Sequence, residues 1–181
     1  MCFGNENDRP RQTALLAGLR APGWKVPEAT IPPFPKFDTF ACVEDSVSIE
    51  VGPLTVTASL YRDEDYRIDD DDVHSERRAA YDSDETYARA MEAREAWMRD
   101  EWFYGMIVLS VSIRDHTVLG SGPALSGIEV NYPHGYRPND YLSGFADDMV
   151  HDALIEAGDA LANLFDGVEE SMKHLKHIME G

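Results

Sequence analysis

Asp147 and His151 have the spacing of neighbouring side chains on one helical turn, because they are four residues apart. A histidine beside a carboxylate could bind a metal ion or transfer a proton as an acid–base pair. A metal site needs a third ligand, however, and the candidates, such as His116 or His134, are distant in the sequence. A solvated acidic helix face is therefore the better interpretation of this pair.

The densest group of carboxylates lies between residues 63 and 72. Seven of these ten residues are acidic, and Arg67 is the only basic one; the acidic residues are Asp63, Glu64, Asp65, Asp69, Asp70, Asp71 and Asp72. Carboxylate oxygens suit calcium, but the D-x-[DN]-x-[DN]-G spacing is absent, and no glycine before Tyr81 could make the sharp turn. Mutual repulsion and low hydrophobicity instead predict an extended, solvated loop.

The sequence contains none of the common catalytic motifs. There is no nucleophile elbow, P-loop, Cys-x-x-Cys pair or H-E-x-x-H motif, and Gly120-Ser121-Gly122 lacks the strand–turn–helix context of a dinucleotide site. Ser121 and Ser126 have no adjacent base in the sequence. We therefore expect no enzyme, no cofactor and no metal, and rank a metal-dependent enzyme built on Asp147 and His151 last among three hypotheses.

The strongest compositional signal is a net charge of −18, from 34 acidic and 16 basic side chains. Residues 1–62 hold 7 acidic and 6 basic side chains, residues 63–101 hold 15 and 6, and residues 102–181 hold 12 and 4. Such a surface repels nucleic-acid phosphates and membrane head groups and attracts basic surfaces. We expect a basic host protein or nucleoprotein complex as the partner, with no direct binding to nucleic acid or membrane. Solubility, salt adaptation or a GC-rich genome would explain the same composition without a function.

Length and cysteine content indicate one ordinary intracellular domain. A chain of 181 residues with 43% apolar side chains can bury a proper core. Cys2 and Cys42 are best interpreted as free thiols in a reducing cytosol. No apolar run approaches the ~18 residues of a membrane helix, and residues 1–20 lack a signal-peptide layout. The predicted location is the cytoplasm.

Two hairpins supply the predicted sheet. Period-2 runs at 47–51 and 54–60 flank Gly52-Pro53 and predict an antiparallel hairpin with Leu54, Val56, Ala58 and Leu60 on its buried face. Met106–Ile113 predicts a second strand pair, with a turn at 115–116 and a glycine-rich, irregular return over Val118–Val130. The unbroken start of the Met106 run indicates burial on both faces. A loop is expected at 132–139.

Two helices complete the predicted fold. The shorter one runs from about Asp82, capped by Glu85, to Asp100, and its apolar side chains are Tyr87, Met91, Trp97 and Met98. The longer one runs from about Asn139 to Phe165 and ends at Gly167. Its predicted core face consists of Leu142, Phe145, Met149, Ala153, Ala157, Leu161 and Leu164. Its predicted outer face carries Asp148, Asp152, Glu156, Asp159, Asp166 and Glu170.

The predicted fold class is α+β, with an antiparallel sheet of about four strands packed by a long C-terminal helix and a shorter middle helix. Residues 1–40 form an N-terminal arm, 41–168 the domain and 169–181 a short basic tail. The arm would contain a short helix at 11–20 and a Pro-rich stretch at 21–38 whose Trp24, Phe34 and Phe37 lie on the main body. A Pro-rich docking peptide is the alternative interpretation of that stretch.

Residues 97–165 resemble a family of small acidic proteins encoded by bacteriophages and other mobile elements. The resemblance is carried by an aromatic-rich segment at Trp97–Tyr104, the run Met106–Ser112, a return strand at Leu119–Glu129 and a closing helix at Tyr141–Leu154. It provides no catalytic or binding residue. It implies a mobile-element context, in which small acidic proteins block host nucleases by imitating DNA, as anti-restriction and anti-CRISPR inhibitors do.

Charge and resemblance together predict an inhibitor of a host nucleic-acid-binding defence complex that acts as a DNA mimic. Duplex DNA presents one charge per ~1.7 Å of axis, and a nuclease groove matches it with Arg and Lys. The expected partner-binding residues are Asp63, Glu64, Asp65, Asp69, Asp70, Asp71, Asp72, Asp148, Asp152, Glu156, Asp159 and Asp166. The alternative is a non-mimic protein-interaction or scaffold module, with a homodimer left open, whose acidity serves solubility only.

Overall fold

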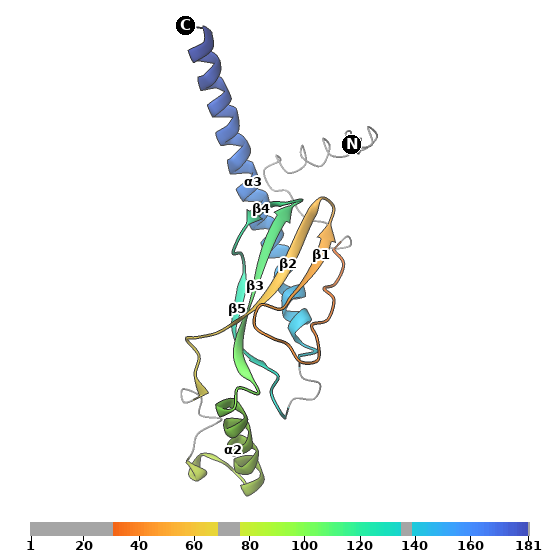
Figure 1. Ribbon diagram of the computed structural model, residues 1–181, viewed down its shortest axis with the longest axis vertical. Coiled ribbons are helices and arrows are strands. Elements are labelled where there is room, and N and C mark those ends of the chain that lie inside the picture. The colour runs from red at the N-terminus through yellow and green to blue at the C-terminus, as the bar shows by residue number, and fades with distance from the viewer. Residues whose placement is uncertain (1–30, 69–76, 135–138, 181) are drawn as a thin grey trace.

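The computed structural model describes residues 31–68, 77–134 and 139–180. The predicted helix at 11–20, Trp24 and Asp69–Asp72 lie outside these ranges. An antiparallel sheet carries a long helix, α3 (Leu142–Glu180), across one face, and a shorter helix, α2 (Asp84–Met98), lies at one end (Figure 1). A 3₁₀ turn at Arg78–Ala80 precedes α2. The α+β class predicted from the sequence is confirmed.

The sheet is built around its third strand. Its strands are β1 (Ser46–Val51), β2 (Leu54–Arg62), β3 (Phe103–Ile113), β4 (His116–Leu119) and β5 (Ala124–Val130). β1, β2, β3 and β4 are neighbours in that order, and β5 pairs with the first half of β3 on the same side as β4. The first predicted hairpin is confirmed, with Ile49 opposite Val56 and a two-residue turn in which Gly52 has a φ of 64°.

The predicted return strand at 118–130 is split into two short strands. Between β4 and β5 the Gly122 N–H donates to the Leu109 carbonyl at 2.8 Å, and the Leu109 N–H donates to the Pro123 carbonyl at 3.0 Å. A Cβ at Gly122 would lie 2.6 Å from a Leu119 methyl carbon and 3.1 Å from the Leu109 carbonyl oxygen, so any larger residue would have to displace these neighbours. The predicted irregularity is therefore a break in the strand.

The core lies on one side of the sheet. Leu54, Val56, Ala58 and Leu60 are all buried, as predicted. The prediction that the first half of Met106–Ile113 is buried on both faces was wrong, because Met106 and Val108 are only half-buried. The other face is polar, as shown by the 2.9 Å contact between the Ser48 and Thr57 hydroxyls, and such one-sided burial is usual for antiparallel sheets.

Helix α3 begins close to its predicted start but continues far past the predicted end at Gly167. It has 39 residues, or about 58 Å at ~1.5 Å per residue. A single glycine costs a helix only ~1 kcal/mol, and the residues after it, such as Met172 and Leu175, favour helix. The predicted basic tail at 169–181 is thus helical as far as Glu180.

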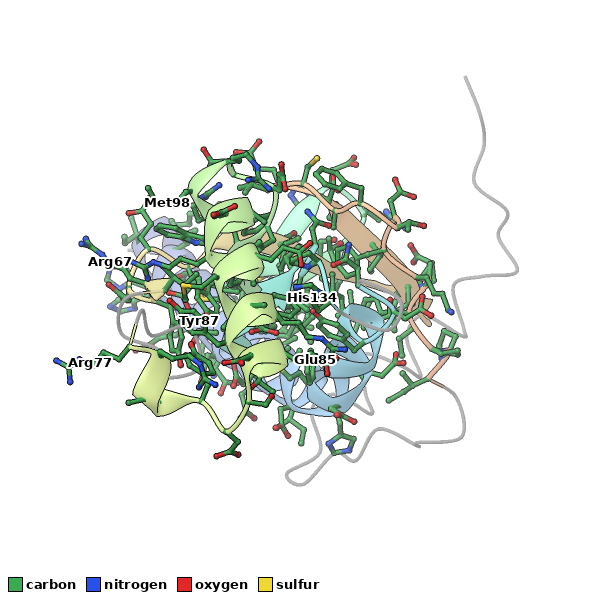
Figure 2. The ribbon with its side chains drawn as sticks, turned by 90° about the horizontal axis from the view of Figure 1, so that it is seen from below. Arg67, Arg77, Glu85, Tyr87, Met98 and His134 are labelled. Atoms are coloured by element: carbon green, nitrogen blue, oxygen red, sulfur yellow. The ribbon has the colours of Figure 1, made fainter. Side chains whose placement is uncertain are left out.

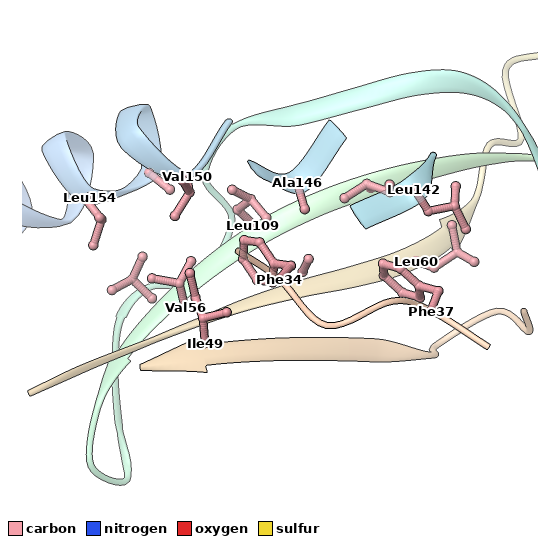
Figure 3. Packing of buried hydrophobic residues seen from close by; sticks show 14 of the residues in the cluster. Phe34, Phe37, Ile49, Val56, Leu60, Leu109, Leu142, Ala146, Val150 and Leu154 are labelled. Atoms are coloured by element: carbon pink, nitrogen blue, oxygen red, sulfur yellow. The ribbon is translucent and has the colours of Figure 1, made fainter. Parts of the chain in front are cut away.

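The N-terminal half of α3 packs on the sheet. Figure 3 shows Leu142, Ala146, Val150 and Leu154 facing Leu60, Val56 and Leu109. The buried apolar side chains of the helix are Leu142, Ala146, Val150, Ala153, Leu154, Ala157 and Leu161, and Ser143 is buried with them. The predicted face was rotated slightly: Phe145 and Met149 are only partly buried, and Leu164 is 62% exposed.

Residues 31–41, here called the N-terminal strap, cover the side of this core. Phe34 and Phe37 are buried in it, which confirms the predicted packing of these two aromatic side chains (Figure 3). The Phe34 N–H donates to the Asp147 carboxylate at 2.8 Å, and the Ser143 hydroxyl donates to the Pro35 carbonyl at 2.7 Å. The strap therefore forms hydrogen bonds with α3 as well as packing against it.

Two asparagines join the strap to the end of β5. Asn139, which is 1% exposed, donates to the Thr39 carbonyl at 2.9 Å and to the Asn131 side-chain oxygen at 2.7 Å. Asn131 in turn exchanges two hydrogen bonds with the Ala41 backbone, at 2.9 and 2.8 Å. Both asparagines have positive φ, at 72° and 61°, a conformation that asparagine tolerates better than most residues.

Helix α2 begins one residue later than a cap at Asp82 would place it. Its N-cap is Ser83, in a capping box with Thr86. Of the predicted apolar side chains, Trp97 is partly buried, whereas Met98 is 70% exposed. Three alanines are buried instead, at positions 90, 93 and 96. Figure 2, seen from the α2 end of the molecule, shows this helix lying lengthwise across the body, with Tyr87 and Met98 along it and His134 beside it.

A small second core lies under α2. It contains Ile68, Ala96, Trp102 and Tyr104, and the Trp102 indole N–H donates to the Ala93 carbonyl at 2.7 Å. The alanine face lets the helix approach the indole closely, and the partly buried Trp97 packs beside it.

Candidate functional site

The acidic loop after β2 is partly structural. The Asp63 carboxylate accepts the N–H groups of Asp65 at 3.1 Å and Gly127 at 2.9 Å, and thereby ties the loop to β5. Glu64 and Asp65 are exposed. Asp69, Asp70, Asp71 and Asp72 are outside the described residues.

The acidic residues of α3 form a straight line on its outer face, here called the acidic stripe. Its members, all exposed, are Asp148, Asp152, Glu156, Asp159 and Asp166. They follow one another after four, four, three and seven residues, so they span ~27 Å on the side away from the core. None of them forms an ion pair with another residue in the described part of the chain.

The structure does not bring the described acidic loop residues together with the acidic stripe. Asp63 lies where β2 ends and β3 begins, because its N–H donates to the Tyr104 carbonyl at 2.9 Å. In Figure 1 this is the end of the sheet next to α2, whereas α3 extends beyond the opposite end. The two regions are therefore separate surfaces.

Asp147 and His151 are both half-buried, beside a shallow hollow that also touches Ile31 and Pro32. Asp147 holds the strap by accepting the Phe34 N–H, which gives it a structural role. The described residues contain no group of three or more side chains that could hold a metal ion. Asp147 and His151 therefore lie where the N-terminal strap is attached to α3.

The surface that sequence reasoning missed is the C-terminal half of α3. Beyond Leu161 the apolar side of the helix is largely exposed: Phe165 still packs against the core, and after it no sheet lies beneath the helix (Figure 1). We call this the apolar stripe; its members, 48% to 85% exposed, are Leu164, Val168, Met172, Leu175, Ile178 and Met179.

The apolar stripe continues the core-facing side of the same helix. Leu161, Val168 and Leu175 are seven residues apart, and Phe165, Met172 and Met179 follow them by four residues each. The sequence contains this spacing, but the prediction that the helix ends at Gly167 excluded the residues after it from the apolar face. On the opposite side of this part of α3 lie Asp166, Glu170 and Lys173.

Ionisable groups elsewhere are perturbed by local contacts only. At the start of α3 burial, together with the nearby charge of Glu129, raises the pKa of Tyr141 to about 12, and its hydroxyl donates to the Glu129 carbonyl. After α2 the hydrogen bond between Arg99 and Glu101 lowers the pKa of Glu101. Neither group belongs to a cluster arranged for catalysis.

Comparison of the chain with protein-family models, with curated proteins and with solved structures finds no match. In the described part of the chain, no helix has a stretch long and apolar enough to cross a membrane. Because the comparisons provide no relative, the proposal below is based on the two surfaces of α3, the acidic stripe and the apolar stripe.

Proposed function

We propose that this chain is a non-catalytic protein-interaction module whose apolar stripe on α3 pairs with a helix of a protein partner. The observation that carries this proposal is the exposure of six large apolar side chains in one line on a helix that projects beyond its sheet. Monomeric soluble proteins rarely expose contiguous apolar surface of this kind, and when they do it commonly marks an interface.

Two energetic arguments support the pairing. Fully burying an aliphatic side chain is worth about 1.5–3 kcal/mol, so six that are half or more exposed offer on the order of 6 kcal/mol per chain before the costs of association. Furthermore, most helical stability comes from packing an amphipathic face, and an unsupported helical segment of this length is marginal in water. A partner helix would bury the apolar stripe and stabilise the segment itself.

The test is site-specific photocrosslinking in the native cell. A photoreactive amino acid at Leu175 should give crosslinked products, whereas the same group at His177, on the outer side of the same turn, should give few. Equal crosslinking at both positions would show that the apolar stripe is not the contact surface.

A second candidate function is favoured by the acidic stripe. Five outward carboxylates without a cation partner in the described residues suit binding to a basic protein or nucleoprotein complex, such as a host defence nuclease, in the cytoplasm. Their mean spacing of ~7 Å is wider than the 3.4 Å per charge of one DNA strand, so charge attraction is better supported than imitation of duplex geometry.

This second candidate predicts salt-sensitive inhibition of a DNA-binding enzyme. Reversing Asp148, Asp152, Glu156 and Asp159 to lysine should abolish the inhibition, and unchanged inhibition would exclude the acidic stripe. Removal of the N-terminal arm is the matched control, because contacts through the arm belong to a different kind of module. That deletion should end at residue 30, since Phe34 and Phe37 are part of the core.

A further inference from the structure

We infer that the occupant of the apolar stripe is a second copy of this chain, with the two α3 helices antiparallel. The inference rests on the proposed function, because it names the partner for the same surface. Three observations carry it: the length of the uncovered helix, the order of charges along it, and the residues at the edge of the apolar stripe.

The uncovered length suits a self-pair in which the two bodies lie at opposite ends. Phe165 is the last side chain of α3 that packs, partly buried, against the core, and Met179 is the last member of the apolar stripe. Fourteen residues separate them, which corresponds to ~21 Å. In an antiparallel pair, the tip of each helix reaches the point where the other one leaves its sheet, so both apolar stripes are covered along their whole length.

The order of charges along the uncovered part decides the orientation. Acidic side chains come first, at Asp166, Glu169 and Glu170, the basic Lys173 and Lys176 follow, with His174 and His177 beside them, and Glu180 ends the helix. An antiparallel pair sets the acidic half of one helix next to the basic half of the other. A parallel pair would set like charges at the same level and would bring two chains of net charge −18 side by side.

One edge of the apolar stripe shows the complementarity in detail. Glu169 and Lys176 are seven residues apart, so they flank the stripe on the same side. In an antiparallel pair, Glu169 of one copy lies beside Lys176 of the other, and the twofold symmetry makes this contact twice. Within its own helix Glu169 pairs with the outer Lys173 at 3.2 Å, and the contact with Lys176 of the other copy would replace or share this exposed ion pair.

Sedimentation analysis of the full chain tests the self-pairing. The unmodified chain should be dimeric at high micromolar concentration. Leu175→Glu should be monomeric, and His177→Glu, which adds a carboxylate to the outer side of the same turn, should remain dimeric. Because Leu175 is 59% exposed and outside the core, this substitution should leave the folding of the body intact, which circular dichroism verifies. A monomeric unmodified chain, or a dimer that tolerates Leu175→Glu, would overturn the inference.

Two measurements test the orientation. Glu169→Lys and Lys176→Glu should each weaken the dimer roughly threefold to tenfold, and the double variant should recover the original affinity. Spin labels at an introduced Asn163→Cys, in a chain that also carries Cys2→Ser and Cys42→Ser, should lie roughly 28 Å apart along the helix axis. Labels at the same level, or a double variant weaker than either single one, would overturn the antiparallel arrangement.

The crosslinking experiment separates the two levels of the proposal. A product at Leu175 with the mass of two chains supports self-pairing. A product with a different protein, together with a monomeric purified chain, overturns self-pairing and leaves the proposed interaction function standing. Absence of any specific product, together with a monomeric chain, overturns both.

Discussion

The two halves of α3 have the same apolar pattern and opposite surroundings. In the first half, Leu142, Val150 and Leu154 are buried against the sheet and the strap. In the second half, Val168, Met172 and their neighbours repeat the pattern without a sheet beneath them. The difference lies in where the sheet ends rather than in the helix. The apolar side of an amphipathic helix is stabilised by burial, and the extent of the sheet determines which part of that side is buried by the chain itself.

The largest expected effect comes from making the same truncation in each half. Leu154→Ala should lower the free energy of unfolding by about 2–5 kcal/mol at every protein concentration, because it leaves a cavity in the core. Leu175→Ala should change it by less than about 0.5 kcal/mol in dilute solution. Its cost should grow with concentration as dimers form, because only the associated state buries that side chain. Urea denaturation at several protein concentrations measures the change in the free energy of unfolding for each variant. Equal changes in the two variants that do not depend on protein concentration would contradict the difference between the two halves of α3.

A second prediction concerns the strap, which covers only the first half of α3. Asn139→Ala should lower the free energy of unfolding by about 1–3 kcal/mol, because it removes a buried side chain that donates to the Thr39 carbonyl and accepts the Asn131 N–H. It also places alanine at a φ of 72°. Asn163→Ala, at an exposed position on α3, is the control and should have almost no effect. Similar costs at the two positions would show that the strap is not held by this network.

Gly167 lies where the covered half passes into the uncovered one. Nothing lies within 4 Å of a Cβ at this position, and its φ is not positive, so Gly167→Ala should stabilise the C-terminal half by about 1 kcal/mol. Circular dichroism and hydrogen exchange of residues beyond 167 should show the gain. Gly52→Ala, at a φ of 64°, should instead destabilise the protein. A loss of helix in Gly167→Ala would mean that the glycine serves a close approach, for example to a partner helix.

The smallest predicted effect lies at the start of the covered half. The pKa of Tyr141 is raised from 10.0 to about 12, so the folded state favours the neutral phenol. Its contribution to stability is complete below pH 10 and is lost as the pH rises toward 12. Ultraviolet titration should show one late-ionising tyrosine that is absent in Tyr141→Phe. Loss of stability over this pH range should also be smaller in that variant.

Local periodicity was a reliable guide in this sequence where it was strong. The alternation at 54–60 predicted the buried face of β2, and the recurrence of apolar residues after Leu142 predicted the covered half of α3. The ends of helices were harder to predict. Gly167 resembled a helix end, but a helix tolerates one glycine whose neighbours favour helix. The alanine face of α2 was missed because small side chains carry little hydrophobic signal, and its contact with Trp102 depends on close approach.

The acidic residues show most clearly what the sequence determines and what it leaves to tertiary structure. The number of carboxylates, and their alignment along the outer side of α3, follow from composition and helical period. The use of Asp63 and Asp147 as ties to β5 and the strap, and the separation of the loop from the helix, depend on contacts between distant segments. The same division holds for α3: its period defines one continuous apolar side, and the length of the sheet leaves half of that side exposed, since burial depends on what lies opposite each residue.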